Sequence, residues 1–356
     1  MGSVLVVNAG STSLKLHLVA DDETTTRVDS LALESDRVDA VAHRVVHGGA
    51  HFRDPVKIDA AVRRQIEELE AIAPLHNAPA LAGIDEAARA LPDVPHIAVF
   101  DTAFHATMLD EAAVYAVPRR WHEEWGVRRY GFHGLSVAWC AERIPSLLDR
   151  GKDGLRLVVC HLGGGCSVTA VRDGRSVDTT MGFSPLEGVP MTTRSGSVDP
   201  GALIYLMRER GLGAEELDHS LNFESGMKGL AGNSGSMVDL ERRVEEGDRE
   251  ANLALDVFVY RVAAAVAAMT VACGGLDGLA FTAGIGENSA LVRARVCERL
   301  RFLGVALDRD RNVGAEPDCD VSTDGSAVRV LVVRAHEELI AARAARRLLA
   351  DAGGGV

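Results

Sequence analysis

Two stretches of the sequence share one plan: Leu5-Val-Val-Asn-Ala-Gly-Ser-Thr-Ser13 and Val158-Val-Cys-His-Leu-Gly-Gly-Gly-Cys166. Each begins as an apolar strand and runs into a loop of small residues. A second strand follows each loop, Leu14–Val19 in the first case and Val168–Val171 in the second. Alternating residues around a glycine-containing turn are typical of a β-hairpin. The similarity suggests an internal duplication, and chance resemblance between two hairpins is the alternative on these residues alone.

The rest of the chain alternates apolar strands with helical patterns, as an α/β protein does. The hairpins predict a domain boundary near residue 150, within the polar stretch Pro145–Gly154. The further expected strands are His96–Phe100, Ser176–Thr179, Gly278–Thr282 and Ala327–Val333, and the expected helices are Asp59–Ile72, Pro79–Ala90, Ala251–Cys273, Ser289–Leu303 and Glu337–Ala350.

Composition and charge exclude several classes of protein. The 356 residues are 47% hydrophobic and 25% charged, which is globular composition. The net charge of −13 disfavours nonspecific binding to nucleic acids or to anionic membranes. Six cysteines without a C-x-x-C pair and an N-terminus without a secretory pattern predict a cytoplasmic protein with reduced thiols. The longest uncharged apolar stretch, Val262–Leu276, is short for a membrane span and predicts a buried helix.

Three loops of small residues are suited to phosphate, because backbone N–H groups in such loops can point at one anion. The first holds Asn8, Ser11, Thr12 and Ser13, with Lys15 as a nearby charge. The others are Gly163–Gly165 and Gly284–Gly286, and each follows an expected strand. One such loop is usually a plain turn. Three together favour a site for a nucleotide or a polyphosphate.

Two arginines and two carboxylates stand in positions that suit the same chemistry. Arg44 lies in His43-Arg-Val-Val-His-Gly-Gly49 and Arg194 in Thr192-Thr-Arg-Ser-Gly-Ser197, where small neighbours allow an anion to approach the guanidinium. Asp101 ends one apolar strand and Glu337 follows another, so both are expected where α/β sheets bind ligands. Two carboxylates with water and phosphate suit Mg²⁺. Surface ion pairs for the arginines, and a helix N-terminus for Glu337, are the alternatives.

Three histidines occur in compact, uncharged settings: His76, His133 and His161. Nothing in their spacing suggests zinc. Each is either a hydrogen-bonded core residue or a donor to a phosphoryl oxygen.

These motifs together resemble the acetate kinase family over nearly the whole chain. The motifs that carry the resemblance are Asn8-Ala-Gly-Ser-Thr-Ser-Leu-Lys15, His43-Arg-Val-Val-His-Gly-Gly49, Ala73-Pro-Leu-His-Asn77, Phe100-Asp-Thr-Ala-Phe-His105, Arg128-Arg-Tyr-Gly-Phe-His-Gly134, Asp178-Thr-Thr-Met-Gly-Phe-Ser-Pro-Leu-Glu-Gly188, Thr193-Arg-Ser-Gly196, Phe281-Thr-Ala-Gly-Ile-Gly-Glu-Asn-Ser289 and Glu337-Glu-Leu339. The resemblance implies an α/β, duplicated actin-like (ribonuclease H-like) fold of two domains with a central cleft between them. Residues 1–150 with a C-terminal helix, 338–356, would form the first domain, and residues 151–337 the second.

The same resemblance implies reversible, direct in-line transfer of the γ-phosphoryl group of ATP to acetate or a similar short acid. It implies Mg²⁺ or Mn²⁺ and a homodimer, while the net charge predicts no nucleic-acid or membrane partner. By analogy with the family, the expected catalytic residues are Arg44, His76, Asp101, His133 and Arg194. The expected phosphate and nucleotide contacts are Asn8, Ser11, Ser13, Lys15, His161, Gly163, Gly165, Gly284 and Gly286. The expected metal ligands are Asn8, Asp101 and Glu337, and the expected acyl pocket is Val46, Leu75, Phe132 and Pro185.

Four positions depart from the family pattern. Gly164 replaces an asparagine of the glycine loop, Ser236 and Val238 stand where an acid and a base clamp adenosine, and His336 replaces the asparagine before Glu337. The alternatives are therefore a different phosphoryl donor, such as pyrophosphate or another nucleotide, and a non-catalytic regulator with the same fold. The acyl-side arginine disfavours the regulator, because a switch protein does not need it.

Overall fold

The structure, a computed structural model, describes residues 2–9, 14–31, 37–232 and 235–353, apart from the side chains of residues 71, 74–76 and 352–353. The chain forms two compact units. Unit 1 consists of Met1–Ala106, Phe132–Trp139 and His336–Val356, and unit 2 of Thr107–Gly131 and Cys140–Ala335. A division by compactness need not coincide with a division by duplicated topology, so the domain boundaries inferred from the sequence stay a prediction.

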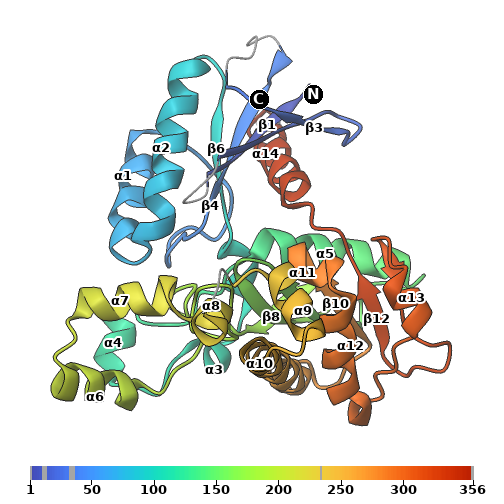
Figure 1. Cartoon of the computed structure of the whole chain (residues 1–356). Helices are drawn as coiled ribbons and strands as arrows, with labels where there is room; N and C mark the ends of the chain where they lie inside the picture. Colours follow the sequence, from blue (N-terminus) through green and yellow to red (C-terminus); the bar gives the residue numbers. More distant parts are fainter. Residues whose placement is uncertain (1, 10–13, 32–36, 233–234, 354–356) are drawn as a thin grey trace. The chain divides into compact units, whose positions relative to one another are not determined.

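Unit 1 is built on a six-stranded mixed sheet with the order β3-β2-β1-β4-β6-β5 (Figure 1). Strand β1 pairs antiparallel with β2 and parallel with β4, and β4 continues parallel with β6. The outer strands β3 and β5 are antiparallel to their neighbours. The strand bounds are β1 Val4–Ala9, β2 Leu14–Val19, β3 Thr25–Val28, β4 Ala40–Val45, β5 Val56–Lys57 and β6 His96–Phe100.

Unit 2 contains a second six-stranded sheet, with the order β11-β12-β10-β7-β8-β9. Here β7 pairs antiparallel with β8 and parallel with β10, β10 is parallel to β12, and the outer strands are again antiparallel. The strand bounds are β7 Arg156–Leu162, β8 Cys166–Arg172, β9 Arg175–Thr179, β10 Gly278–Thr282, β11 Cys319–Asp320 and β12 Arg329–Val332.

The two sheets have the same topology. If β1, β2, β3, β4, β6 and β5 are matched in turn with β7, β8, β9, β10, β12 and β11, every parallel and every antiparallel pair of the first sheet recurs in the second. The two hairpins identified in the sequence are β1–β2 and β7–β8, which hold equivalent places. The predicted duplication is therefore confirmed.

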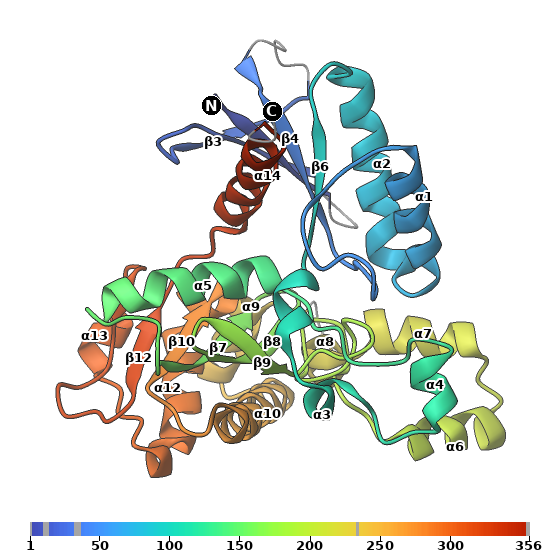
Figure 2. The same cartoon turned by 180° about the vertical axis from the view of Figure 1, so that it is seen from behind.

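Helices cover both faces of the unit 1 sheet, and a long helix lies against the sheet of unit 2 (Figures 1 and 2). Helices α2 and α14 both contact β1 and β4, and α10 contacts β7 and β8. The principal helices are α1 Ala60–Glu68, α2 Pro74–Ala90, α5 Gly134–Leu147, α6 Pro200–Arg210, α7 Ala214–Phe223, α9 Met237–Glu245, α10 Arg249–Cys273, α12 Ala290–Arg299 and α14 Glu337–Gly353. The shorter helices are α3 Asp110–Ala113, α4 Arg119–Glu123, α8 Gly226–Ala231, α11 Ala283–Asn288 and α13 Arg309–Val313.

Helix α10 is the one helix of the described chain that is long and apolar enough to cross a membrane. Ten of its side chains, Phe258 and Val262 among them, are nevertheless buried against the protein. The expected helix Ala251–Cys273 is therefore found with its start at Arg249, and the apolar run Val262–Leu276 belongs to it as far as Cys273.

The start of α2 was predicted wrongly. The sequence suggested a beginning at Pro79, whereas the helix begins at Pro74 and continues through Pro79. Pro74 suits the first turn of a helix, because the N–H groups there have no intrahelical acceptor. Pro79 lies beyond the first turn, so the helix continues there without the bond that an N–H group at this position would donate to the Leu75 carbonyl.

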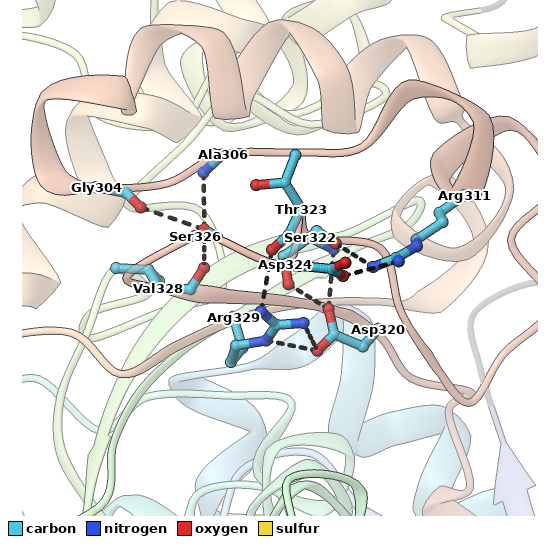
Figure 3. Close-up of polar contacts among 10 residues, drawn as sticks. All are labelled: Gly304, Ala306, Arg311, Asp320, Ser322, Thr323, Asp324, Ser326, Val328 and Arg329. Atoms are coloured by element: carbon cyan, nitrogen blue, oxygen red, sulfur yellow. Dashed lines mark hydrogen bonds and ion pairs between the residues drawn. The ribbon is translucent and has the colours of Figure 1, made fainter.

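Polar side chains form a network at the edge of the unit 2 sheet where β11 is the outer strand (Figure 3). Asp320 and Arg329 form an ion pair at 2.6 Å, and Arg311 and Asp324 form another at 2.8 Å. The Ser326 hydroxyl accepts a hydrogen bond from the Ala306 N–H group at 3.0 Å. Oxygen side chains at alternate positions are a pattern that calcium loops share, but both carboxylates are occupied by guanidinium groups here. Two arginine–aspartate ion pairs thus hold this edge together.

The core of unit 1 contains a buried histidine pair that should make stability depend on pH. His43 Nε2 lies 2.9 Å from His96 Nδ1, and His96 Nε2 lies 3.0 Å from the Leu91 carbonyl oxygen. Burial lowers the pKa of His43 to about 3, with a further contribution from His96, and burial also lowers the pKa of His96. Both folded-state values therefore lie below that of an unfolded histidine, about 6.5.

We expect the free energy of unfolding to be highest above pH 6.5 and to fall as the pH drops. Below pH 6.5 the histidines of the unfolded chain become protonated while the folded pair stays neutral. The free energy of unfolding therefore falls by about 1.4 kcal/mol per pH unit for each proton that only the unfolded chain binds. Urea unfolding followed between pH 7 and pH 5 measures this slope. His43→Leu should make the slope shallower, and an equal slope in the variant would contradict this origin.

Candidate active site

Four predicted residues meet at one edge of the unit 1 sheet. Asn8 lies near the end of β1, Arg44 near the end of β4, and Asp101 directly after β6. Since these strands are parallel neighbours, their carboxyl ends share an edge, where α/β proteins gather ligands. Glu337 reaches the same place as the first residue of α14.

Arg44 is the centre of this cluster. Its Nε donates to Asp101 Oδ1 at 3.0 Å and its Nη2 to Asp101 Oδ2 at 2.5 Å, a bidentate pair. Its Nη1 donates to Asn8 Oδ1 at 3.1 Å and lies 3.4 Å from Glu337 Oε2. Asn8 Nδ2 is 3.5 Å from the same Glu337 oxygen. The guanidinium is therefore held in one orientation by three residues from separate parts of the chain.

The electrostatics of the cluster favour charged forms. Burial disfavours the charged guanidinium of Arg44, but the carboxylates of Asp101 and Glu337 outweigh burial and raise its pKa above the usual value. Asp101 is fully buried, and both of its oxygens accept hydrogen bonds from Arg44. Glu337 is partly exposed and only one of its oxygens faces Arg44.

This donor set fits Mg²⁺ better than a softer metal. The carboxylate of Glu337 and the amide oxygen of Asn8 are hard oxygen ligands, and Mg²⁺ in phosphate sites takes one or two carboxylates with water and phosphate oxygens. Within the described part of the chain, no group of three or more His, Cys, Asp or Glu side chains gathers as a complete protein cage would require. The residues present suit a metal that arrives with a phosphate ligand.

His133 occupies a strained turn beside this cluster. Its backbone is left-handed, with φ of 58°, directly before α5. Strain of this kind persists only where surrounding contacts impose it. His105 Nε2 lies 2.9 Å from the Phe132 carbonyl oxygen, and Gly134 packs so closely on Asp101 that an added Cβ would lie 2.0 Å from the Asp101 carbonyl oxygen. The loop that carries His133 is thus fixed to the loop that carries Asp101.

Arg194 lies in unit 2 and differs from Arg44 in its partners. Its Nη1 donates to the Pro185 carbonyl oxygen at 2.7 Å. No ion pair between Arg194 and a carboxylate is found among the described residues, and burial lowers the pKa of Arg194. A partly buried cation without a counter-ion is costly, and an anionic ligand would relieve that cost.

Two glycine loops lie together in unit 2. His161 is near the end of β7, Gly163–Gly165 follow, and Gly284 and Gly286 lie in α11 after the parallel neighbour β10. A Cβ added to Gly163 would lie 3.6 Å from the Ala283 Cβ, so the loops are adjacent. Beside them is a cavity of about 220 Å³ lined by Gly163, Gly164, Thr192, Met237, Val238, Glu241, Gly284, Ile285, Asn288 and Ser289.

The remaining predicted residues are placed less completely. Ser11 and Ser13 lie outside the described residues, as do the side chains of Leu75 and His76. Lys15 is exposed and is the register partner of Asn8 in the β1–β2 hairpin. Of the expected acyl pocket, Val46 and Phe132 lie in unit 1 and Pro185 in unit 2. The roles assigned to all these residues stay predictions.

Sequence reasoning missed two residues that fix the site loops. Asn77 Oδ1 accepts from the His47 N–H group at 3.2 Å, and Asn77 Nδ2 donates to the His47 carbonyl at 3.1 Å. Glu287 Oε1 accepts from the Ala283 N–H at 3.0 Å and from the Ala335 N–H at 2.9 Å. Both lie inside motifs already noted, so position in the motif was the one available signal.

Comparison with known proteins identifies close relatives. The sequence profile of the acetokinase family matches residues 24–343. An acetate kinase from Gloeobacter violaceus is 51% identical over 312 residues, which cover 87% of this chain and 76% of that protein. Among solved structures, a propionate kinase from Francisella tularensis aligns with a TM-score of 0.90 at 34% identity, covering 97% of this chain and 99% of the other. The acetate kinase of Porphyromonas gingivalis aligns with a TM-score of 0.88 at 33% identity, covering 98% and 100%.

Proposed function

This chain belongs to the acetokinase family, and from that premise we propose that it is an acetate kinase, which transfers the γ-phosphoryl group of ATP reversibly to the carboxylate of acetate. The products are ADP and acetyl phosphate. The observation that carries the proposal is the cluster of Asn8, Arg44, Asp101 and Glu337 at the carboxyl edge of the unit 1 sheet, in a chain of this family.

Phosphoryl transfer requires the protein to position the two substrates and to place positive charge around the transferring group, and it requires no covalent intermediate with the protein. Arg44 is oriented by its bidentate bond to Asp101, and Arg194 offers a guanidinium that no carboxylate of the described residues pairs with. We assign Arg44 and Arg194 to the carboxylate of acetate and the moving phosphoryl group, and His133 to a hydrogen bond that strengthens as charge develops on that group. Acetate is already a nucleophile, so no general base is required. Direct transfer predicts inversion at phosphorus.

A divalent metal is part of this proposal. Glu337 and Asn8 would hold Mg²⁺ or Mn²⁺, and Asp101, which pairs with the same Arg44 guanidinium, is the third proposed ligand. When bound, the ion neutralises charge on the phosphate oxygens. Asp101 also has a role without metal, because it fixes the direction of Arg44.

ATP is the proposed donor. The cavity beside Gly163 and Gly284 supports a nucleotide, because apolar Met237, Val238 and Ile285 line it next to two glycine loops. Val238 is 79% exposed at this cavity and Gly164 has no atom within 4 Å of an added Cβ. Both are among the positions where the sequence departs from the family pattern, so a looser contact with the nucleotide is expected.

Acetate is the proposed acid because relatives that cover most of this chain are acetate kinases, and Val46 and Phe132 stay the predicted contacts of its methyl group. We also propose a homodimer and a cytoplasmic location. The reduced state of all six cysteines, five of which are buried, is compatible with that location.

A hydroxamate assay tests the proposed function. Acetate, propionate and butyrate are each combined with ATP, GTP and pyrophosphate, with Mg²⁺ and with excess EDTA. Acetate with ATP and Mg²⁺ should give the highest rate, and EDTA should abolish it. If hydroxamate forms with none of these pairs, the proposal is refuted. If it forms only with pyrophosphate, then pyrophosphate and not ATP is the donor.

A further inference from the structure

The guanidinium of Arg194 donates its hydrogen bond to a segment of chain without regular secondary structure. Residues 181–190 form neither helix nor strand, yet Pro185 in this segment supplies the carbonyl oxygen that Arg194 contacts at 2.7 Å. The direction of the Arg194 guanidinium is therefore set by where the Pro185 carbonyl points. A loop without ladder hydrogen bonds needs other contacts to hold that carbonyl still.

Three side chains provide those contacts. The carboxylate of Glu187 accepts a short hydrogen bond from the Tyr115 hydroxyl, and its Oε1 accepts from Arg129 Nη2 at 2.9 Å. Arg129 Nη1 donates to the carbonyl oxygens of Thr179 and Thr180, both at 3.0 Å. The Arg129 guanidinium also lies 5.5 Å from the centre of the Tyr115 ring. One arginine thus ties the end of β9 to the segment after it.

The same tyrosine fixes the other end of the segment. The Tyr115 hydroxyl accepts from the Phe183 N–H group at 2.9 Å while it donates to Glu187. The Tyr130 N–H group donates to the Gly182 carbonyl at 3.0 Å. A Cβ at Gly182 would lie 1.6 Å from Glu187 Oε2 and 2.0 Å from the Tyr115 oxygen, so the close approach requires glycine. Residues on both sides of Pro185 are therefore anchored.

We propose that Glu187, Tyr115 and Arg129 are positioning residues that set the direction of the Arg194 guanidinium through the carbonyl of Pro185. This inference rests on the proposed function, because it assigns Arg194 to the moving phosphoryl group. A guanidinium with one neutral acceptor and no carboxylate partner in the described chain can turn, and a misplacement of about 1 Å can lower a rate by about 10²-fold. If the Arg129–Glu187 ion pair were purely structural, it would stabilise unit 2 without affecting the direction of the Arg194 guanidinium.

A double-mutant cycle separates the two roles. Glu187→Ala should lower kcat for acetyl phosphate formation by about 10- to 100-fold, with little change in the KM for ATP. In the Arg194→Ala background the same change should have almost no further effect, because there is no guanidinium left to position. Thermal unfolding of each variant shows whether it is folded. Glu246→Gln, which alters an exposed acid paired with Arg242 at 2.6 Å, is the matched control and should leave kcat unchanged.

Tyr115→Phe keeps the ring and removes only the hydroxyl, so it extends the test if Glu187→Ala does not fold. The same drop in kcat in both backgrounds, or no drop in kcat in a folded variant, would overturn the proposal.

Titration calorimetry with acetyl phosphate is a second measurement that does not need turnover. Glu187→Ala should bind it more weakly than the wild type, and the double variant no more weakly than Arg194→Ala. A wild type that binds in this way but makes no product would refute the proposed function and keep the positioning role.

Discussion

Turnover should fall by about 10³-fold when Arg194 is replaced by alanine, because the change removes positive charge aimed at the transferring group. Arg194 forms no ion pair with a carboxylate of the described chain, so its charge is available to the ligand. Since the developing charge exists mainly in the transition state, kcat should fall far more than the KM for ATP rises. Steady-state hydroxamate assays of wild type and variant measure both.

The control is an arginine of the same unit without any assigned role. Arg208 is exposed near the end of α6, and Arg208→Ala should leave turnover within about twofold of the wild type. If Arg194→Ala also stayed within that range while folded, its place in the reaction would be refuted.

Arg44 would give a less direct test of charge. Its removal would leave the fully buried Asp101 carboxylate without its bidentate partner, which costs stability as well as activity. A loss of turnover in Arg44→Ala would therefore mix two causes. The different partners of the two arginines make Arg194 the cleaner position.

Local patterns in the sequence were enough for much of the fold. Alternation and glycine turns predicted both hairpins, and the apolar run Gly278–Thr282 is β10 with the predicted bounds. The order of strands within each sheet was not predictable in the same way, because pairing depends on contacts between distant parts of the chain. The start of α2 was missed because two prolines, Pro74 and Pro79, both suit a helix start and only packing decides between them.

The candidate site was predictable where chemistry and strand ends coincide. Asp101 follows an apolar strand and Glu337 follows another, and the structure brings both to Arg44. The partners that fix a loop were not predictable. Glu187 is 72 residues from Tyr115 and 58 from Arg129, so nothing local in the sequence links them. Likewise, only the folded chain shows that no acid among the residues described pairs with Arg194.

The second large effect is expected at Gly134, which has no chemistry of its own. A Cβ there would lie 2.0 Å from the Asp101 carbonyl oxygen and 3.0 Å from the Phe104 Cβ. Neither atom can rotate away, and the Asp101 N–H group is itself bonded to the Val45 carbonyl at 3.0 Å. In Gly134→Ala either the start of α5 or the Asp101 peptide must therefore move.

Either movement displaces a catalytic group, since His133 precedes Gly134 and Asp101 orients Arg44. We expect Gly134→Ala to lower turnover by about 10²-fold, the effect of roughly 1 Å of misplacement. Overpacking should also destabilise the protein by about 1–3 kcal/mol, which thermal or urea unfolding would measure. Gly151→Ala is the control, because an added Cβ there meets no atom within 4 Å. A Gly134→Ala protein as stable and as active as Gly151→Ala would mean that the loops of Asp101 and His133 can separate without consequence, and the geometry assigned to Arg44 would then not be what catalysis requires.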